Sequence, residues 1–278
     1  MVEQYVDSQV AVITLVDGPH GNLLDPEGLA ELASALERSV GDARVRAVLL
    51  RSNGPAFCRG MDLARLAAHA SPGAAADAEK EVDLFADVLQ KIYSAALPIV
   101  CLVEGEVKAG GVGLAVACDI IVATERASFE LGEVIFGLIP ANVLPLLTLR
   151  VSAQKARSLV LSSRRLTARE ALHLDLVDDV VPPAEAEGRT REIFKRLLCS
   201  SPHALATAKE FTAELIGSTP VQASVLARQR LVEMMHDPRT LDGVRAFQEG
   251  HTPSWFSRFR PSRPLALGAA GQGEEGAR

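Results

Sequence analysis

Apolar and polar positions alternate along several short stretches of the chain, and this pattern predicts β-strands. The segment from Gln9 to Leu15 alternates and is rich in β-branched residues, and Val45 to Arg51 is a second strand of this kind. Pro98 to Val103 is continuously apolar, as expected of a strand that is buried on both faces. Three further strands are expected at 119–123, 128–131 and 177–181.

Helical spacing dominates the stretches between these strands and the whole last third of the chain. Asp25-Pro26-Glu27 predicts a capped helix that runs to about Val40, with proline in its first turn. Thr167-Ala168-Arg169-Glu170 is a capping box that opens a short helix. The other predicted helices are 76–96, 111–118, 143–149, 152–161, 184–200, 202–216 and 219–236.

This order of elements predicts an α/β core that is followed by an all-helical region. We expect the core to span residues 1–197 and the C-terminal helical region to span 198–262. Residues 263–278 become rich in Gly, Glu, Gln and Ala, and this composition predicts a disordered tail. The stretch around Ser71-Pro72-Gly73 is expected to be mobile and near the site.

Two glycine-centred stretches are the main candidates for chemistry. They are Phe57-Cys58-Arg59-Gly60-Met61-Asp62-Leu63 and Ala109-Gly110-Gly111-Val112-Gly113. Glycine lets the backbone approach a ligand closely because it has no Cβ. The second stretch opens a helix, whose first N–H groups are unpaired and can donate to a developing anion. If the N–H groups of Met61 and Gly110 converge on one point, they form an oxyanion hole for an enolate.

Composition excludes several other classes of protein. The chain has 278 residues, of which 48% are hydrophobic and 23% charged, as is typical of a globular protein. A net charge of −6 argues against a nucleic-acid surface. Neither a leader pattern nor an apolar run of eighteen residues is apparent, so we expect no membrane association and a cytoplasmic location. The four cysteines and six histidines show no metal-ligand spacing, so we expect reduced thiols and no metal.

Over about residues 5 to 256 the chain resembles the crotonase (enoyl-CoA hydratase) superfamily. The resemblance rests on Phe57–Leu63, on Val103-Glu104-Gly105 through Cys118-Asp119-Ile120, and on Phe129–Pro140, which occur in the order typical of the family. It implies a crotonase (ClpP-like) fold, a spiral of ββα turns, with a C-terminal helical region that forms a homotrimer or hexamer. It also implies an acyl thioester substrate whose carbonyl oxygen lies between the N–H groups of Met61 and Gly110.

One catalytic position departs from the family pattern. Hydratases of this family use two glutamates; Glu133 matches one of them, but Gly113 occupies the position of the other. We expect Glu133 to be the general acid/base and Asp62 to assist it, although Asp62 is equally suited to cap the following helix. Glu130 is an alternative second carboxylate, for which an exposed strand position is the simpler interpretation. The missing side chain at Gly113 is expected to enlarge the pocket for a branched β-carbon.

The segment from Phe129 to Pro145, with its Asn142-Val143-Leu144-Pro145 ending, is similar to the dehydratase of polyketide β-branching (HMG-synthase) cassettes. This resemblance implies dehydration of a 3-hydroxy-3-methylglutaryl thioester on an acyl carrier protein to the 3-methylglutaconyl thioester. No cofactor is implied beyond the phosphopantetheine that carries the substrate. The expected substrate-binding residues are Arg59, Gly111, Gly113 and Asn142, with Lys108 as a further candidate.

Other functions remain open on the sequence alone. An enoyl-CoA hydratase or an isomerase acting on a CoA thioester, and a glutaconyl thioester decarboxylase, would use the same oxyanion hole. A crotonase-fold protein without catalytic activity could instead act as an oligomeric scaffold. The basic residues Arg258, Arg260 and Arg263 are suited either to a CoA phosphate or an acidic carrier protein, or simply to solvent.

Overall fold

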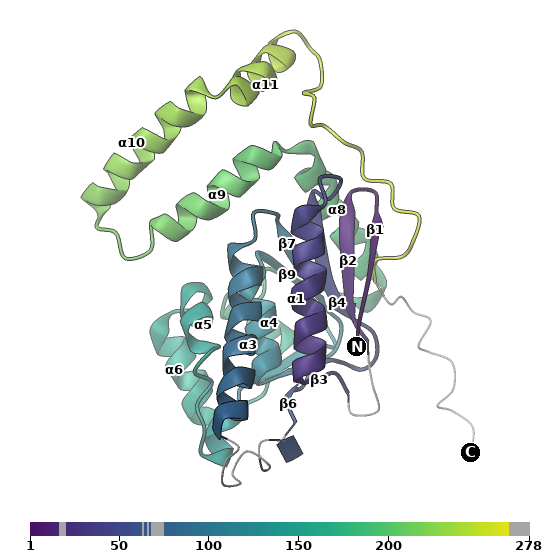
Figure 1. The fold of residues 1–278 in the computed structure, drawn as a ribbon, viewed down its shortest axis with the longest axis vertical. Helices are drawn as coiled ribbons and strands as arrows, with labels where there is room; N and C mark the ends of the chain where they lie inside the picture. Colours follow the sequence, from purple (N-terminus) through teal and green to yellow (C-terminus); the bar gives the residue numbers. More distant parts are fainter. Residues whose placement is uncertain (17–20, 63, 66, 68–74, 267–278) are drawn as a thin grey trace.

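The structure, a computed structural model, describes residues 1–16, 21–62, 64, 65, 67 and 75–266. Figure 1 shows β-strands packed with helices in one body, from which the last helices extend along one side. The predicted mobile stretch at 71–73 lies outside the described residues.

The larger of two main sheets has six strands in the order β1-β2-β4-β7-β9-β12. Its strands are β1 (Val2–Asp7), β2 (Val10–Leu15), β4 (Ala47–Ser52), β7 (Ile99–Val103), β9 (Ile120–Thr124) and β12 (Asp179–Val181). Strand β1 is antiparallel to β2, and the other neighbours are parallel. The sequence pattern did not reveal β1, because this edge strand is only half-buried and its apolar positions are interrupted by polar ones.

A second sheet has the order β11-β10-β8-β5, and two very short strands pair beside it. These strands are β5 (Ala56–Cys58), β8 (Glu106–Lys108), β10 (Ser128–Glu130), β11 (Leu166–Thr167), and the pair β3 (Leu23–Leu24) and β6 (Gly60–Met61). The chain runs repeatedly from a strand of the large sheet to one of the small sheet and then into helical structure, as in β4-β5, β7-β8 and β9-β10. The predicted spiral of ββα turns is therefore confirmed.

Helices cover both faces of the large sheet. The described helices are α1 (Pro26–Gly41), α3 (Ala75–Ser94), α4 (Gly110–Ala117), α5 (Leu144–Arg150), α6 (Ala153–Ser162), α7 (Ala168–His173), α8 (Ala186–Cys199), α9 (Pro202–Glu214), α10 (Pro220–His236) and α11 (Pro238–Gln248), with 3-10 turns η1 (Glu133–Phe136) and η2 (Pro183–Glu185). Helices α10 and α11 extend away from the sheet (Figure 1). The predicted caps form, since Asp25 accepts from the Gly28 N–H and Thr167 and Glu170 cap each other. Among the described residues, no helix is both long and apolar enough to cross a membrane.

Strand residues alternate between two cores because successive side chains point to opposite faces of a sheet. Ile13, Leu50 and Cys101 face the core under α1, α3 and α4. Val12, Leu49 and Val100 face a second core, which α8 covers with Phe194 and which also contains Phe259.

Three glycines let the segment 55–60 pack closely against the segment 105–111. A Cβ on Gly60, whose φ is +78°, would lie 2.7 Å from the Cβ of Ala109 and 3.2 Å from the Gly110 nitrogen. A Cβ on Gly105 would overlap the Pro55 carbonyl, and one on Gly111 would overlap the carbonyl of Cys58. The two predicted glycine stretches therefore touch, and only residues without a side chain permit this contact.

The C-terminal helices begin where α9 leaves the body. Lys209 on α9 fixes this junction, because its Nζ lies 2.6 Å from the Asp119 carboxylate and 3.0 Å from the Leu97 carbonyl. The predicted boundary at residues 197/198 falls inside α8 and is too early by a few residues, since Leu198 is still buried in the second core. Helix α11 was not predicted as a separate element.

The predicted start of a disordered tail at residue 263 is also too early. Leu265 and Ala266 are buried in the second core, and their N–H groups donate to the Glu187 carboxylate. Arg263 stacks on the Tyr5 ring at 4.8 Å from its centroid. Residues 267–278 lie outside the described part of the chain.

The backbone is strained where the chain enters α4. Ala109 has φ +48° and ψ −122°, a region that glycine adopts far more readily than alanine. Replacement by glycine should relieve about 1–3 kcal/mol of strain and lose about 0.5–1 kcal/mol to the more flexible unfolded chain. We therefore expect Ala109→Gly to raise the free energy of unfolding, measured by urea titration.

The same substitution in an ordinary helix provides the control. Ala30 is exposed inside α1, so Ala30→Gly should lower the free energy of unfolding by about 0.5–1 kcal/mol. If the two variants lose stability alike, the strain at Ala109 is not real.

Candidate active site

A cavity of about 460 Å³ lies where the two glycine stretches meet. Its walls come from α3, from β3 and β6, from the start of α4, and from the segment between Glu130 and Val143. Met61 and Gly110 both line it. Segments that are far apart in the sequence thus share one cavity, as the two glycine stretches predicted.

Gly110 brings a backbone donor to this cavity. It is the first residue of α4, so its N–H belongs to the first turn, which has no acceptor within the helix. Phe85 of α3 packs over this position, since a Cβ on Gly110 would lie 3.1 Å from its ring. The ring thus packs against the Cα of Gly110 and leaves no room for a side chain at this position.

Glu133 is the carboxylate whose surroundings are most unusual. It opens the turn η1 and lines the cavity, and its Oε2 is buried without a hydrogen-bond partner among the described residues. Burial raises the pKa of Glu133 above its ordinary value of 4.5, and a hydrogen bond from its own backbone N–H opposes this only in part. An unpaired carboxylate with a raised pKa in a cavity is a good candidate for proton transfer.

Glu130 also lines this cavity, so the interpretation of Glu130 as an exposed strand position is wrong. It is half-buried at the end of β10, and its carbonyl oxygen accepts from the Ala109 N–H at 2.9 Å. The strand therefore places a second carboxylate in the cavity and also holds the strained Ala109 in position.

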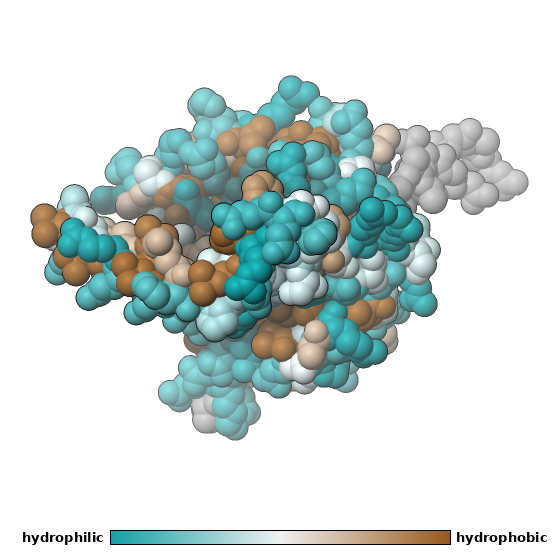
Figure 2. Space-filling view, turned by 90° about the horizontal axis from the view of Figure 1, so that it is seen from above, coloured by the Kyte–Doolittle hydropathy of each residue, from teal (hydrophilic) through white to brown (hydrophobic). Residues whose placement is uncertain are grey.

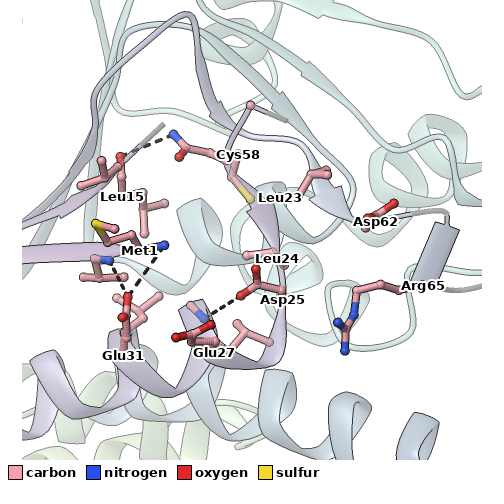
Figure 3. A pocket seen from close by; sticks show the side chains of 17 residues that line it. Met1, Leu15, Leu23, Leu24, Asp25, Glu27, Glu31, Cys58, Asp62 and Arg65 are labelled. Carbon is pink, nitrogen blue, oxygen red and sulfur yellow. Dashed lines mark hydrogen bonds and ion pairs between the residues drawn. The ribbon is translucent and has the colours of Figure 1, made fainter. Parts of the chain in front are cut away.

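Asp62 does not line the cavity of Glu133. Its Oδ1 accepts from the Ala64 N–H at 2.8 Å, which is the capping role that was the alternative to catalysis. It lies with Arg65 beside a second cavity of about 530 Å³, where Glu31 binds the chain's N-terminal residues (Figure 3). Asp62 and Glu133 thus line different cavities, and their joint catalytic role stays a prediction. These two cavities adjoin at Leu24, Asp25 and Leu29.

Gly111 and Gly113 are also absent from the described lining of the cavity. Gly111 packs against Cys58, where a side chain would collide with the backbone. A Cβ on Gly113 would lie 3.0 Å from Val143 and 3.3 Å from Phe85. The expectation that Gly113 enlarges the pocket is therefore wrong, because apolar side chains already fill this space.

Arg59, Lys108 and Asn142 all line the cavity, and their role in substrate binding stays a prediction. Asn142 also donates to the Val82 carbonyl at 3.2 Å, which ties its loop to α3. Arg59 and Lys108 both contact Glu106, through Nε at 3.1 Å and Nζ at 3.2 Å. The two cations therefore have a common counter-ion.

The other candidates lie elsewhere. Arg260 and Arg263 form part of a segment that binds the β1–β2 turn, where Asp7 and Ser8 accept its backbone N–H groups. Neither Arg258, Arg260 nor Arg263 is among the described residues that line the cavity. Burial raises the pKa of Cys58 to about 12, which makes its thiol a poor nucleophile.

Sequence reasoning missed the contribution of α3. Glu81 and Phe85 line the cavity from this helix, and Leu89 continues the same face towards Gly113. Their spacing of four residues places them on one side of a helix, so the signal was present in the amphipathic pattern. The pattern alone could not say that this face meets the glycine stretches.

The described residues contain no group of three or more His, Cys, Asp or Glu side chains that could hold a metal.

The sequence pattern of the enoyl-CoA hydratase/isomerase family matches residues 6–258. A Thermus thermophilus protein with an enoyl-CoA hydratase name is 33% identical over 250 residues, which cover 90% of this chain and 98% of that protein. The carnitinyl-CoA dehydratase of Salmonella paratyphi A is 32% identical over 255 residues, which cover 88% of this chain and 94% of the relative.

A solved structure agrees with this likeness. The enoyl-CoA hydratase of Shewanella pealeana superposes with a TM-score of 0.85 at 26% identity, covering 91% of this chain and 95% of its own. The match extends over the spiral core and the C-terminal helices alike. This chain belongs to the enoyl-CoA hydratase/isomerase family of the crotonase superfamily.

Proposed function

We propose that this protein is a lyase that removes water from a β-hydroxyacyl thioester through an enolate. The N–H groups of Met61 and Gly110 form the oxyanion hole, and Glu133 transfers the protons. Glu133 takes the α-proton, which leaves the negative charge on the thioester oxygen. The enolate then expels the β-hydroxyl group, which receives that proton from Glu133 and departs as water.

The observation that carries this proposal is the unpaired Glu133 carboxylate in the cavity that Gly110 and Met61 line. An α-proton of a thioester is only weakly acidic, so its removal requires both a base and stabilisation of the enolate. In other enzymes, losing one oxyanion-hole donor costs about 2.7–4 kcal/mol. The dehydratase among the relatives supports the direction of the reaction.

For the natural substrate we propose the 3-hydroxy-3-methylglutaryl thioester of an acyl carrier protein, which would become the 3-methylglutaconyl thioester. This choice rests on the segment 129–145, whose residues Glu130, Glu133 and Asn142 all line the cavity. A single proton-transfer carboxylate also suits the proposal, since Val143 and Phe85 fill the space of the second family glutamate. The phosphopantetheine arm arrives with the substrate, and a cytoplasmic location stays a prediction.

Mass spectrometry of the loaded carrier protein tests the reaction directly. We expect the 3-hydroxy-3-methylglutaryl form to lose one water with the wild-type enzyme. Glu133→Gln keeps the shape of the side chain but cannot accept a proton, so the rate should fall at least about 100-fold.

Asp62→Asn serves as the matched control and should retain most of the activity, because Asp62 faces the other cavity. An unchanged substrate, together with conversion of crotonyl-CoA or isomerisation of an unsaturated thioester, would instead assign one of the alternative activities. Activity that survives in Glu133→Gln would remove this residue from the mechanism.

The raised pKa of Glu133 predicts a pH dependence. A base must be ionised, so kcat/KM should rise with pH through an apparent pKa above 4.5. Stability should change in the opposite sense, because the folded protein holds this proton more tightly than the unfolded chain does. Between pH 4.5 and the raised pKa, the unfolding free energy of wild type should fall relative to Glu133→Gln. Denaturant titrations across this range would contradict the assignment if the unfolding free energy of wild type instead rose relative to that of Glu133→Gln as the pH increased.

We further propose that the chain assembles as a homotrimer or hexamer through its C-terminal helices. Helix α10 has no buried residue, and Leu231, Met235 and Phe247 on α10 and α11 are 62%, 58% and 81% exposed. Figure 2 looks at the molecule from the side of these helices and shows apolar side chains at its surface. Exposed apolar area of this kind is typical of a surface that binds another protein.

Light scattering should give three or six times the 29.6 kDa mass of the chain. Leu231→Glu should lower that mass because it places a charge in the apolar contact. Val40→Glu, at an exposed position of α1, is the control and should leave the mass unchanged. A monomeric wild-type protein would refute the proposed assembly.

A further inference from the structure

Two cationic side chains occupy equivalent positions relative to the two proposed oxyanion donors. Arg59 precedes Met61 by two residues, and Lys108 precedes Gly110 by two residues. Both cations line the cavity, and both are about 40% exposed, at 42% and 38% of their side chains. Each proposed oxyanion donor therefore has a positive charge close to it on the same strand or turn.

A single carboxylate holds this pair of cations in place. Glu106 lies between them on β8, and Arg165 adds a third cation at 3.2 Å from Glu106 Oε1. Arg165 is itself fixed by donating to the Ser128 hydroxyl at 2.7 Å. Burial alone would raise the pKa of Glu106, but Lys108, Arg165 and Arg59 together hold this pKa below its ordinary value. Glu106 therefore stays ionised and can neutralise only one of three positive charges.

The cations keep donors for a ligand. Among the described residues, the ion pair with Glu106 uses Nε of Arg59, and Nη1 packs near Gly21, whereas a guanidinium carries five N–H donors in a planar fork. Lys108 contacts the same carboxylate through an ammonium group with three donors. Carboxylate and phosphate oxygens are the groups that such donors bind most strongly.

The rest of the cavity repels anions. Among the described residues that line the cavity, the other ionisable side chains are those of Asp25, Glu81, Glu130 and Glu133, and all four are acidic. Arg65 pairs with Glu81. The cavity is therefore polarised, with its positive charge concentrated at Arg59 and Lys108.

We propose that Arg59 and Lys108, oriented by Glu106, bind an anionic group of the thioester substrate. This inference rests on the proposed function for the identity of the ligand as a thioester. Two parts of such a substrate can supply the anion: a carboxylate at the end of the acyl chain, or the phosphate of the pantetheine arm. Both would be bound by the same charge-assisted hydrogen bonds.

Four thioesters separate these sources. Butyryl and glutaryl groups differ by one terminal carboxylate, and each is attached either to pantetheine or to phosphopantetheine, which differ by the phosphate. None of the four carries a β-hydroxyl group, so binding by calorimetry does not depend on dehydration. If the dehydration proposal fails, the binding comparison is still valid.

We expect the carboxylate or the phosphate to strengthen binding to the wild-type protein, and we expect added salt to weaken that gain. Arg59→Gln and Lys108→Gln should each weaken binding of the compounds with the recognised anion by about 10- to 100-fold, as hydrogen bonds to charged groups do. Butyryl-pantetheine, which has neither anion, should bind to both variants within about threefold of its affinity for the wild-type protein.

Arg169→Gln is the matched control. Arg169 also forms an ion pair with a glutamate, Glu125, but is not among the described residues of the cavity wall. The Arg169→Gln protein should bind all four compounds with the affinities of wild type, and thermal melting would show that each variant is folded. A loss confined to the glutaryl compounds identifies the acyl carboxylate, and one confined to the phosphopantetheine compounds identifies the phosphate. An equal loss for all four, or none, would overturn the proposal.

Discussion

The close contact between the glycine stretches is the constraint on which the rest of this structure depends. Gly60, Gly105 and Gly111 each occupy a place where a Cβ would collide with backbone or side-chain atoms of the facing segment. Their lack of side chains lets β6 and the N-terminus of α4 line one cavity. The strained Ala109 belongs to the same junction, and its N–H is held by the carbonyl of Glu130. Backbone geometry, rather than a cluster of reactive side chains, therefore defines the site.

The electrostatics of the cavity follow from how its charges are paired. Glu133 is buried without a partner, and its pKa rises for that reason. Glu106 is surrounded by cations, and its pKa falls although burial opposes the change. These two glutamates are thus suited to the different tasks proposed for them, proton transfer and the positioning of cations. This separation is the pattern expected where a site performs acid/base chemistry on an anionic substrate.

The C-terminal region is attached to the rest of the chain at its two ends. Lys209 and Asp119 fasten α9 to the body, and the segment up to Ala266 returns to cover the large sheet. The helices between these two attachments bury little of their apolar surface within the chain. Their exposed apolar side chains are the basis of the proposed assembly.

The sequence by itself determined the elements and the location of the chemistry. Period-two strands, capped helices and two glycine stretches are local features, so the elements and the oxyanion-hole hypothesis for Met61 and Gly110 could be derived from them. The spiral fold and the role expected of Glu133 came from the resemblance to the crotonase superfamily. Tertiary structure alone decided which side chains share the cavity. It brought Glu130, Glu81 and Phe85 to the site, placed Asp62 beside the adjoining cavity, and filled the space at Gly113 with Val143. Packing between segments far apart in the chain made these choices, because spacing along one segment does not specify what that segment meets.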